Sequence, residues 1–186
     1  MLERLRSIVQ KVNAARDLQS ALDIIVRKVR DALDTQVCSV FLLDSDINAH
    51  VLMASDGLNK ESVGHVSLEA GEGLVGLVAK HAEPINLQDA SLHPSFHYLK
   101  DTGEELYHSF LGVPIIHHRS VLGVLVVQHE ERRRFDESEE AFLITLSAQL
   151  AGVIAHAEAT GAVEGMSPSG HKTSDTVFPG VSGSSG

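Results

Sequence analysis

Two apolar runs separated by four polar residues constrain the fold of this chain more than any other feature. The first run is FLGVPII (110–116), the second is VLGVLVVQ (121–128), and HHRS (117–120) joins them. Each run has the length of a β-strand, and the link has the length of a hairpin turn. Both runs are apolar at nearly every position, which is typical of strands covered on both faces. The sequence therefore predicts a central antiparallel hairpin.

Two residues of this region raise separate questions. His117 and the following histidine could be a metal or proton-transfer site, but neighbours at a strand–turn junction point in different directions. We therefore interpret HHRS as a solvated hairpin corner. Pro114 cannot donate a hydrogen bond to a sheet ladder, so it requires a bulge or a position whose N–H would face no partner.

Periodicity predicts the other elements. Apolar residues at three- and four-residue steps indicate two helices within residues 1–34, with Asp17 as the cap between them. Asp136 followed by Glu139 is a capping-box pattern, worth about 1 kcal/mol, at the start of a long helix that ends near Ala159. The remaining predicted elements are strands at 37–44, 50–57, 62–68 and 85–87 and a short helix at 73–81.

Composition excludes several classes of function. The net charge of −10 disfavours nucleic acid and anionic membrane surfaces as partners, because both are negatively charged. No run reaches 18 apolar residues, so no membrane span is expected, and no export signal is recognised. The single cysteine, Cys38, cannot form an internal disulfide and favours a reducing, cytoplasmic setting. The chain lacks tryptophan, so its core is expected to be aliphatic.

The C-terminal segment differs in composition from the rest. Between Gly161 and Gly186 the chain has six glycines, six serines and two prolines in 26 residues. Such a segment cannot bury enough apolar surface to offset its conformational entropy. We expect a folded domain at 1–160 and a flexible linker at 161–186.

Sequence motifs of catalytic or metal-binding sites are incomplete here, or their residues have a structural interpretation. EAGEGLVG (69–76) lacks the lysine and Ser/Thr of a phosphate-binding loop. Cys38 lies within an apolar strand, where burial makes a thiol inert. The sequence has no HExxH motif among its 11 histidines. We therefore expect no catalytic residue, metal site or cofactor.

The segment 88–107 is the strongest candidate for a binding site. Long irregular connections within a compact domain are usually functional, and apolar walls with a few polar groups are typical of small-molecule pockets. The alternative is an ordinary lid that packs on the sheet. The candidate ligand-binding residues are Asn86, Asp89, His93, Phe96, His97, Tyr98, Glu105 and Ser109.

The order of elements, together with EGLVGLVAKHAEPINLQDASLHPSF and SFLGVPIIHHRSVLGVLVVQ, resembles the GAF domain family over roughly residues 17–158. LDTQVCSVFLLD and FDESEEAFLITLSAQLA are similar to the N-terminal GAF domains of nitrogen-related phosphoenolpyruvate–protein phosphotransferases. The resemblance implies an α+β fold, with a six-stranded antiparallel sheet of order 3-2-1-6-5-4. The terminal helices would pack on one face and the ligand loops would lie on the other.

The resemblance also implies a function. The domain would sense nitrogen status through glutamine or 2-oxoglutarate, and it would form a homodimer through its terminal helices. The full-length enzyme would transfer phosphate to a histidine phosphocarrier protein, using a phosphohistidine region that this chain lacks. The alternative is a structural dimerisation module without a ligand. The Asn-Lys of cyclic-nucleotide-binding members and the cysteines of bilin-binding and sulfoxide-reducing members have no counterpart here.

Overall fold

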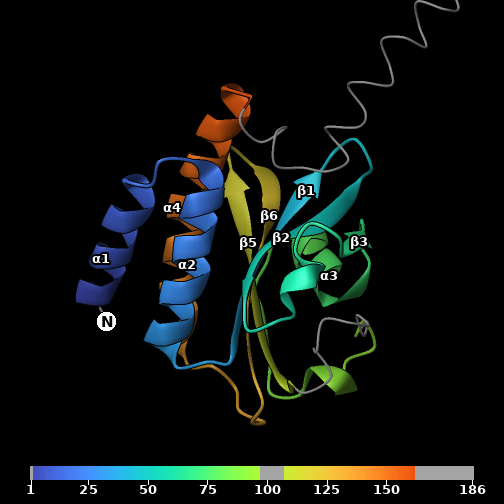
Figure 1. Ribbon diagram of the computed structural model, residues 1–186. Coiled ribbons are helices and arrows are strands. Elements are labelled where there is room, and N and C mark those ends of the chain that lie inside the picture. Colours follow the sequence, from blue (N-terminus) through green and yellow to red (C-terminus); the bar gives the residue numbers. More distant parts are fainter. Residues whose placement is uncertain (1, 97–106, 162–186) are drawn as a thin grey trace, which may run out of the picture.

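The computed structural model describes residues 2–96 and 107–161. They form one six-stranded sheet of order β3-β2-β1-β6-β5-β4, which confirms the predicted fold. Helices α1, α2 and α4 cover one face, and α3 lies on the other (Figure 1). The elements are α1 (Leu2–Asn13), α2 (Leu18–Leu33), β1 (Val37–Asp44), β2 (Ala49–Asp56), β3 (Ser67–Glu69), α3 (Gly73–His81), β4 (Ile85–Leu87), β5 (Ser109–His117), β6 (Ser120–His129), α4 (Glu137–Ala159) and the short 3-10 turns η1 (Lys60–Ser62) and η2 (Ala90–Leu92).

The predicted hairpin is confirmed as β5 and β6. His117 pairs with Ser120, so His118 and Arg119 form a two-residue turn. Both turn residues have positive φ, 48° and 70°, which is the requirement of the type I′ turn. The rings of the two adjacent histidines meet edge to face, with planes 81° apart. HHRS is therefore the corner of a hairpin.

Pro114 fits into β5 for both predicted reasons. β4 pairs with β5 only as far as Gly112, so no described strand lies beside Pro114 on that side. The register between β5 and β6 shifts between Ile115 and Ile116, one residue beyond the proline. A bulge beside an unpaired edge tolerates the missing N–H.

The third strand is shorter than predicted. The sequence predicts a strand over 62–68, whereas β3 covers only Ser67–Glu69. The preceding residues form a tight turn instead, in which the Val66 amide donates to the carbonyl of Ser62. Gly64 has φ of 83° and its amide donates to the Leu52 carbonyl at 2.7 Å. A local turn therefore replaces the first half of the expected strand.

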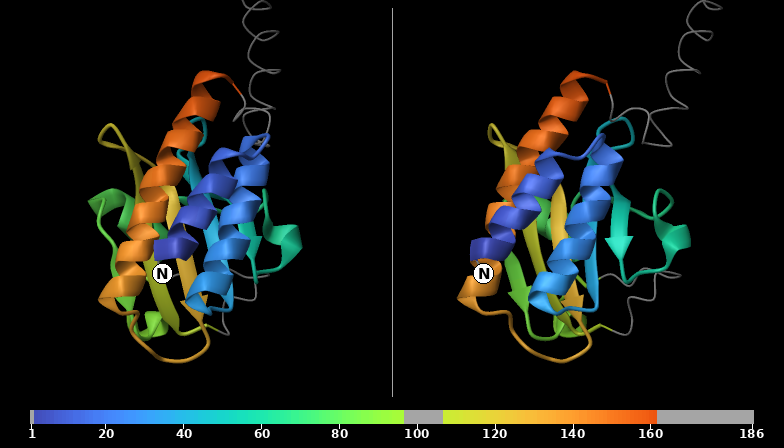
Figure 2. Two further views of the ribbon diagram at one scale, coloured as in Figure 1. Left: turned by 90° about the vertical axis from the view of Figure 1, so that its left-hand side faces the viewer. Right: turned by 60° about the vertical axis from the view of Figure 1, so that its left-hand side comes forward.

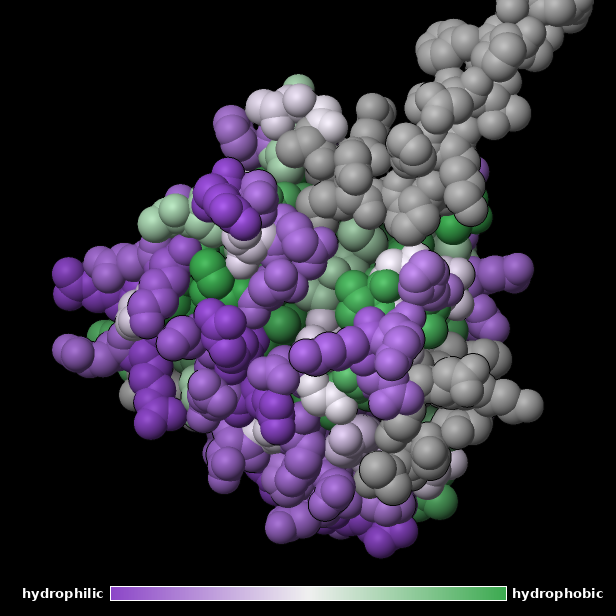
Figure 3. Space-filling model, viewed as in Figure 1, coloured by the Kyte–Doolittle hydropathy of each residue, from purple (hydrophilic) through white to green (hydrophobic). Residues whose placement is uncertain are grey.

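The sheet separates two hydrophobic clusters. The larger cluster joins α1, α2 and α4 to the sheet, and the smaller one lies beneath α3 and contains Phe41 and Phe110. α1 is the outermost layer (Figure 2) and contacts α2 and α4, with Ile8 and Val12 as its buried residues. In the view of Figure 3, the side that carries α1 and α2 is largely hydrophilic.

Side-chain caps begin the two long helices as predicted. Asp17 accepts a hydrogen bond from the Ser20 amide at 2.8 Å and is the N-cap of α2. Asp136 and Glu139 form the reciprocal capping box at the start of α4. By length and composition, α4 is the one helix in the described ranges that could cross a membrane, but 44% of its most apolar window is buried in this fold.

Candidate functional site

The described ends of the connection between β4 and β5 (88–96 and 107–108) adjoin the sheet end where β1 begins and β6 ends, because Val37 pairs with Gln128 and Ser109 with His129. The structure describes five of the predicted ligand-binding residues: Asn86, Asp89, His93, Phe96 and Ser109. His97, Tyr98 and Glu105 fall outside the described residues, so their predicted role stays a prediction.

Asn86 joins β4 to the start of α4. Its Nδ2 donates to the Phe135 carbonyl at 2.8 Å, and its Oδ1 accepts from the Phe135 amide at 3.2 Å. Nδ2 also lies 3.4 Å from Glu140 Oε1. The amide group of Asn86 thus pairs with one backbone unit in the way a neighbouring strand would. This explains an asparagine at position 86 without a ligand.

Asp89 is the centre of a polar cluster at the start of the connection. Its carboxylate caps η2 by accepting from the Ser91 amide and hydroxyl, and it lies 2.8 Å from Arg132 Nε. These hydrogen bonds, first from Ser91 and then from Arg132, lower the pKa of Asp89 to about 2. His108 Nδ1 lies 3.6 Å from the same carboxylate and is buried without a hydrogen-bond partner among the described residues.

Ser109 fastens the other end of the connection. Its hydroxyl donates to the Glu131 carbonyl and accepts from the Arg133 amide at 2.9 Å. Arg133 Nη1 lies 3.2 Å from Glu139 Oε1, and the Arg133 guanidinium carbon lies over the Phe135 ring, 4.6 Å from its centroid. The buried hydroxyl is therefore part of the link between β5 and the β6–α4 loop.

His93 and Phe96 differ from the three polar residues above. His93 Nδ1 accepts from the Ser95 amide at 3.0 Å, which closes a local turn after η2. Phe96 and Tyr107 are half-buried and pack on the cluster beneath α3. The two described ends of the connection thus pack on the same apolar cluster beneath α3.

Sequence reasoning missed Arg132 and His108 as members of this cluster. Arg132 is 43 residues from Asp89, and nothing local to either residue indicates the pair. The available signal was the run RRR (132–134), directly before the capping box. Three adjacent cations beside a helix that begins with acidic residues indicate a network of ion pairs at that junction.

Other chemistry has no support among the described residues. No group of three His, Cys, Asp or Glu side chains could hold a metal ion in residues 2–96 and 107–161. Cys38 is fully buried, and burial raises the pKa of its thiol far above the usual range. Such a thiol does not act as a nucleophile.

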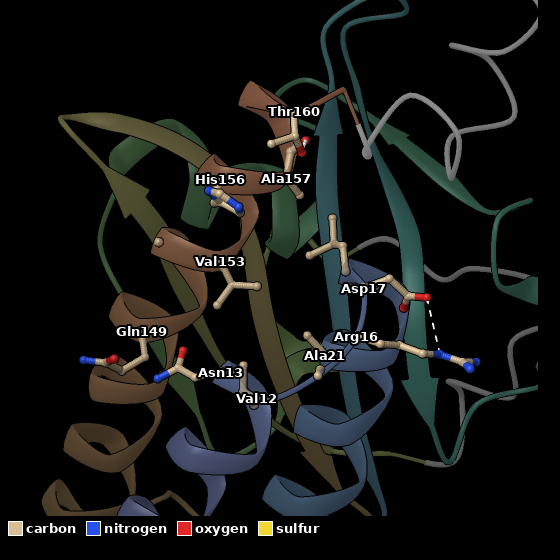
Figure 4. Close-up of a pocket in the computed structure, with 13 residues that line it drawn as sticks. Val12, Asn13, Arg16, Asp17, Ala21, Gln149, Val153, His156, Ala157 and Thr160 are labelled. Carbon is tan, nitrogen blue, oxygen red and sulfur yellow. Dashed lines mark hydrogen bonds and ion pairs between the residues drawn. The ribbon is translucent and has the colours of Figure 1, made fainter.

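Two hollows lie away from the predicted site. One, of about 650 Å³, lies on the helical face between the α1–α2 turn and the end of α4 (Figure 4). Val153 and His156 line it from α4, opposite Ala21. A second, of about 410 Å³, lies beside α3 at the far end of the sheet.

Comparisons with known proteins agree with this geometry. A model of the family "GAF domain" matches residues 17–154. A phosphoenolpyruvate-dependent phosphotransferase system protein of Salmonella typhimurium is 48% identical over 160 residues, which are 86% of this chain and 21% of that protein. The chain therefore spans about one fifth of the length of this relative.

Two solved structures are similar in sequence and fold. The GAF domain of a phosphoenolpyruvate-protein phosphotransferase (ptsP) from Coxiella burnetii is 50% identical with a TM-score of 0.84, covering 87% of this chain and 96% of that one. The corresponding domain from Acinetobacter is 52% identical with a TM-score of 0.79, covering 86% and 96%. With the family model matched over most of the described residues and the six-stranded sheet in the expected order, the chain belongs to the GAF domain family.

Proposed function

We propose that this chain is the regulatory GAF domain of a cytoplasmic, nitrogen-related phosphoenolpyruvate–protein phosphotransferase. In this proposal it senses a nitrogen or carbon metabolite, glutamine or 2-oxoglutarate, and controls phosphate transfer to a histidine phosphocarrier protein. The observation that carries the proposal is 50% identity to a phosphotransferase GAF domain, of which this chain covers 96%.

The proposed sensing site lies at the two described ends of the β4–β5 connection. Asp89 and Ser109 hold the two ends of the connection against the β6–α4 loop. The Arg132 side chain is 60% exposed and pairs with Asp89, and in this proposal it exchanges that carboxylate for one on a ligand. A ligand shifts the domain only if it binds one state of this cluster more tightly than the other.

A binding experiment tests the sensing proposal. Glutamine and 2-oxoglutarate are titrated into the chain while its melting temperature and the resonances of Arg132 are followed. A ligand at 100 times its Kd raises the free energy of unfolding by about 2.7 kcal/mol. Arg132→Gln should weaken this effect, whereas Arg119→Gln in the hairpin turn should not. No stabilisation by either compound would contradict the sensing proposal and favour the structural alternative.

We further propose a homodimer that forms through α4. The helix is apolar around most of its circumference, yet Ile144 is 41% exposed. The outward residues Ala141, Thr145, Ala148 and Gly152 follow one another at steps of four and three, the spacing of a coiled-coil seam. A Cβ on Gly152 would meet no atom within 4 Å. Small residues at such a seam allow a second helix to approach closely.

α1 contributes less to this surface than its sequence suggests. Ile8 and Val12 are buried within the subunit, against α2 and α4. Their apolar side chains are therefore explained without a dimer. Leu2 is 77% exposed and remains available to a partner.

Sedimentation tests the dimer proposal. The wild-type chain at micromolar concentration should sediment as a dimer, and Ala148→Glu should convert it to a folded monomer because the charge would be buried in the seam. Ser45→Glu, in the exposed β1–β2 turn, is the matched control and should leave the dimer intact. A monomeric wild type would contradict the proposal.

A further inference from the structure

A second cavity lies at the end of the sheet opposite the β4–β5 connection. Leu43 at the end of β1 and Val121 at the start of β6 line it, together with residues of α3. The connection instead adjoins the start of β1, because Val37 pairs with Gln128. The two places are therefore separated by the length of the central strands. The volume of about 410 Å³ exceeds the roughly 30 Å³ that one water occupies in the liquid, so the cavity has room for more than one water molecule.

His50 gives this cavity a polar group that the fold does not use. The residue lies on β2, where its backbone pairs with Leu43 on one side and Leu68 on the other. It lines the cavity and is only 4% exposed. Its Nδ1 is buried and has no hydrogen-bond partner in the part of the chain that the structure describes. Buried polar atoms are nearly always paired, so an unpaired one marks a place where a partner fits.

The rest of the lining determines the chemistry of that partner. Lys80, in the last turn of α3, is the one charged residue among the described residues that line the cavity, and it is exposed. Asn48 adds a neutral amide, and the cavity has no carboxylate in its lining as far as residues 2–96 and 107–161 are concerned. Leu43 and Val121 supply apolar contact. A cation, a neutral imidazole and an apolar wall together favour an anion with a short carbon chain.

The wall of the cavity is set by a close backbone contact. A Cβ on Gly76 of α3 would lie 2.5 Å from the backbone of Gly71, so the helix can approach this turn only with glycine at position 76. This contact fixes α3 beside the turn that precedes it. Lys80, one helical turn further along α3, lines the same cavity as His50.

We propose that this cavity binds a short-chain carboxylate that carries a second polar group. The carboxylate pairs with Lys80, the chain lies between Leu43 and Val121, and the second polar group hydrogen bonds to His50 Nδ1. This site is distinct from the sensing site proposed at Asp89 and Arg132.

NMR titration with 4-hydroxybutyrate as the probe tests the proposal. Saturable shifts are expected for the His50 ring and the Val121 methyl groups in the millimolar range. Butyrate lacks the hydroxyl and 4-hydroxybutyramide lacks the charge, so each should bind more weakly. Lys80→Gln should weaken binding about threefold, as expected for one exposed ion pair, while Lys60→Gln should not. His50→Phe should abolish the preference for 4-hydroxybutyrate over butyrate.

Several results would overturn the proposal. One is the absence of saturable shifts at His50 and Val121. A second is equal binding of all three probes. A third is unchanged affinity for 4-hydroxybutyrate in Lys80→Gln, and this measurement still tests the proposal if His50→Phe does not fold. Shifts confined to Arg132 would also overturn it, while leaving the proposed sensing function standing.

Discussion

Arg132 Nε lies 2.8 Å from the Asp89 carboxylate, and this pair joins the β4–β5 connection to the loop between β6 and α4. The two segments are distant in sequence but adjacent in the fold, because β4 and β6 lie on either side of β5. The same loop leads directly to the capping box of α4. The proposed sensing site is therefore connected through this loop to the helix that we propose as the dimer surface.

Asp89 should lose its low pKa in steps. The hydrogen bond from the Ser91 hydroxyl is the largest cause of its lowered pKa and that from Arg132 the next, so Ser91→Ala and Arg132→Gln should each raise the pKa of Asp89. A carboxyl whose pKa falls from 3.8 to about 2 on folding stabilises the fold above pH 3.8. That contribution is lost as the pH falls toward 2. Carboxyl NMR titration measures each value, and equal pKa values in wild type and both variants would contradict the assignment.

Asn86→Ala should destabilise the fold without changing its architecture. The substitution leaves both backbone groups of Phe135 without their side-chain partners. Loss of a partly buried hydrogen-bonded partner costs about 1–3 kcal/mol. Urea unfolding gives the difference, and Gln88→Ala, at an exposed neighbouring position, is the control. A cost no larger than that of the control would show that the hydrogen bonds between Asn86 and Phe135 do not contribute to stability.

Local features could be predicted from the sequence because their causes lie within a few residues. The capping box needs only Asp136 and Glu139, and the hairpin needs two apolar runs at a short spacing. The clamp between Asn86 and Phe135 spans 49 residues, so it depends on which strands become neighbours. Sequence patterns place polar residues near a loop but do not show whether their polar atoms face a ligand or the protein backbone.

The hairpin turn should tolerate and favour residues that adopt positive φ. His118 and Arg119 both have a left-handed backbone conformation with positive φ, which costs a non-glycine residue about 1 kcal/mol or more. Replacing them with Asn and Gly should stabilise the domain by about 1 kcal/mol. Thermal unfolding measures the change, and His117→Asn, just outside the turn, is the control. A destabilised double variant would indicate that the two side chains have a role that their positions do not reveal.

His50 should make the domain sensitive to mild acid. Burial lowers the pKa of this histidine below its ordinary value of 6.5, so the folded state resists the proton that the unfolded state accepts. The unfolded chain then binds more protons, and stability must fall as the pH falls below 6.5. One such group contributes a slope of at most about 1.4 kcal/mol per pH unit. Stability should be constant with respect to this residue above that pH, where the imidazole is neutral in both states.

Urea midpoints between pH 7.5 and pH 5 measure that slope. His50→Phe, which fills a similar volume without a titratable nitrogen, should flatten it, whereas the exposed His81→Asn should leave it unchanged. The buried Nδ1 without a partner among the described residues makes a second effect measurable in the same series: 4-hydroxybutyrate should raise the urea midpoint of the wild type more than that of His50→Phe. An unchanged slope in His50→Phe would mean that other groups carry the acid sensitivity and that His50 is more accessible in solution than its 4% exposure indicates.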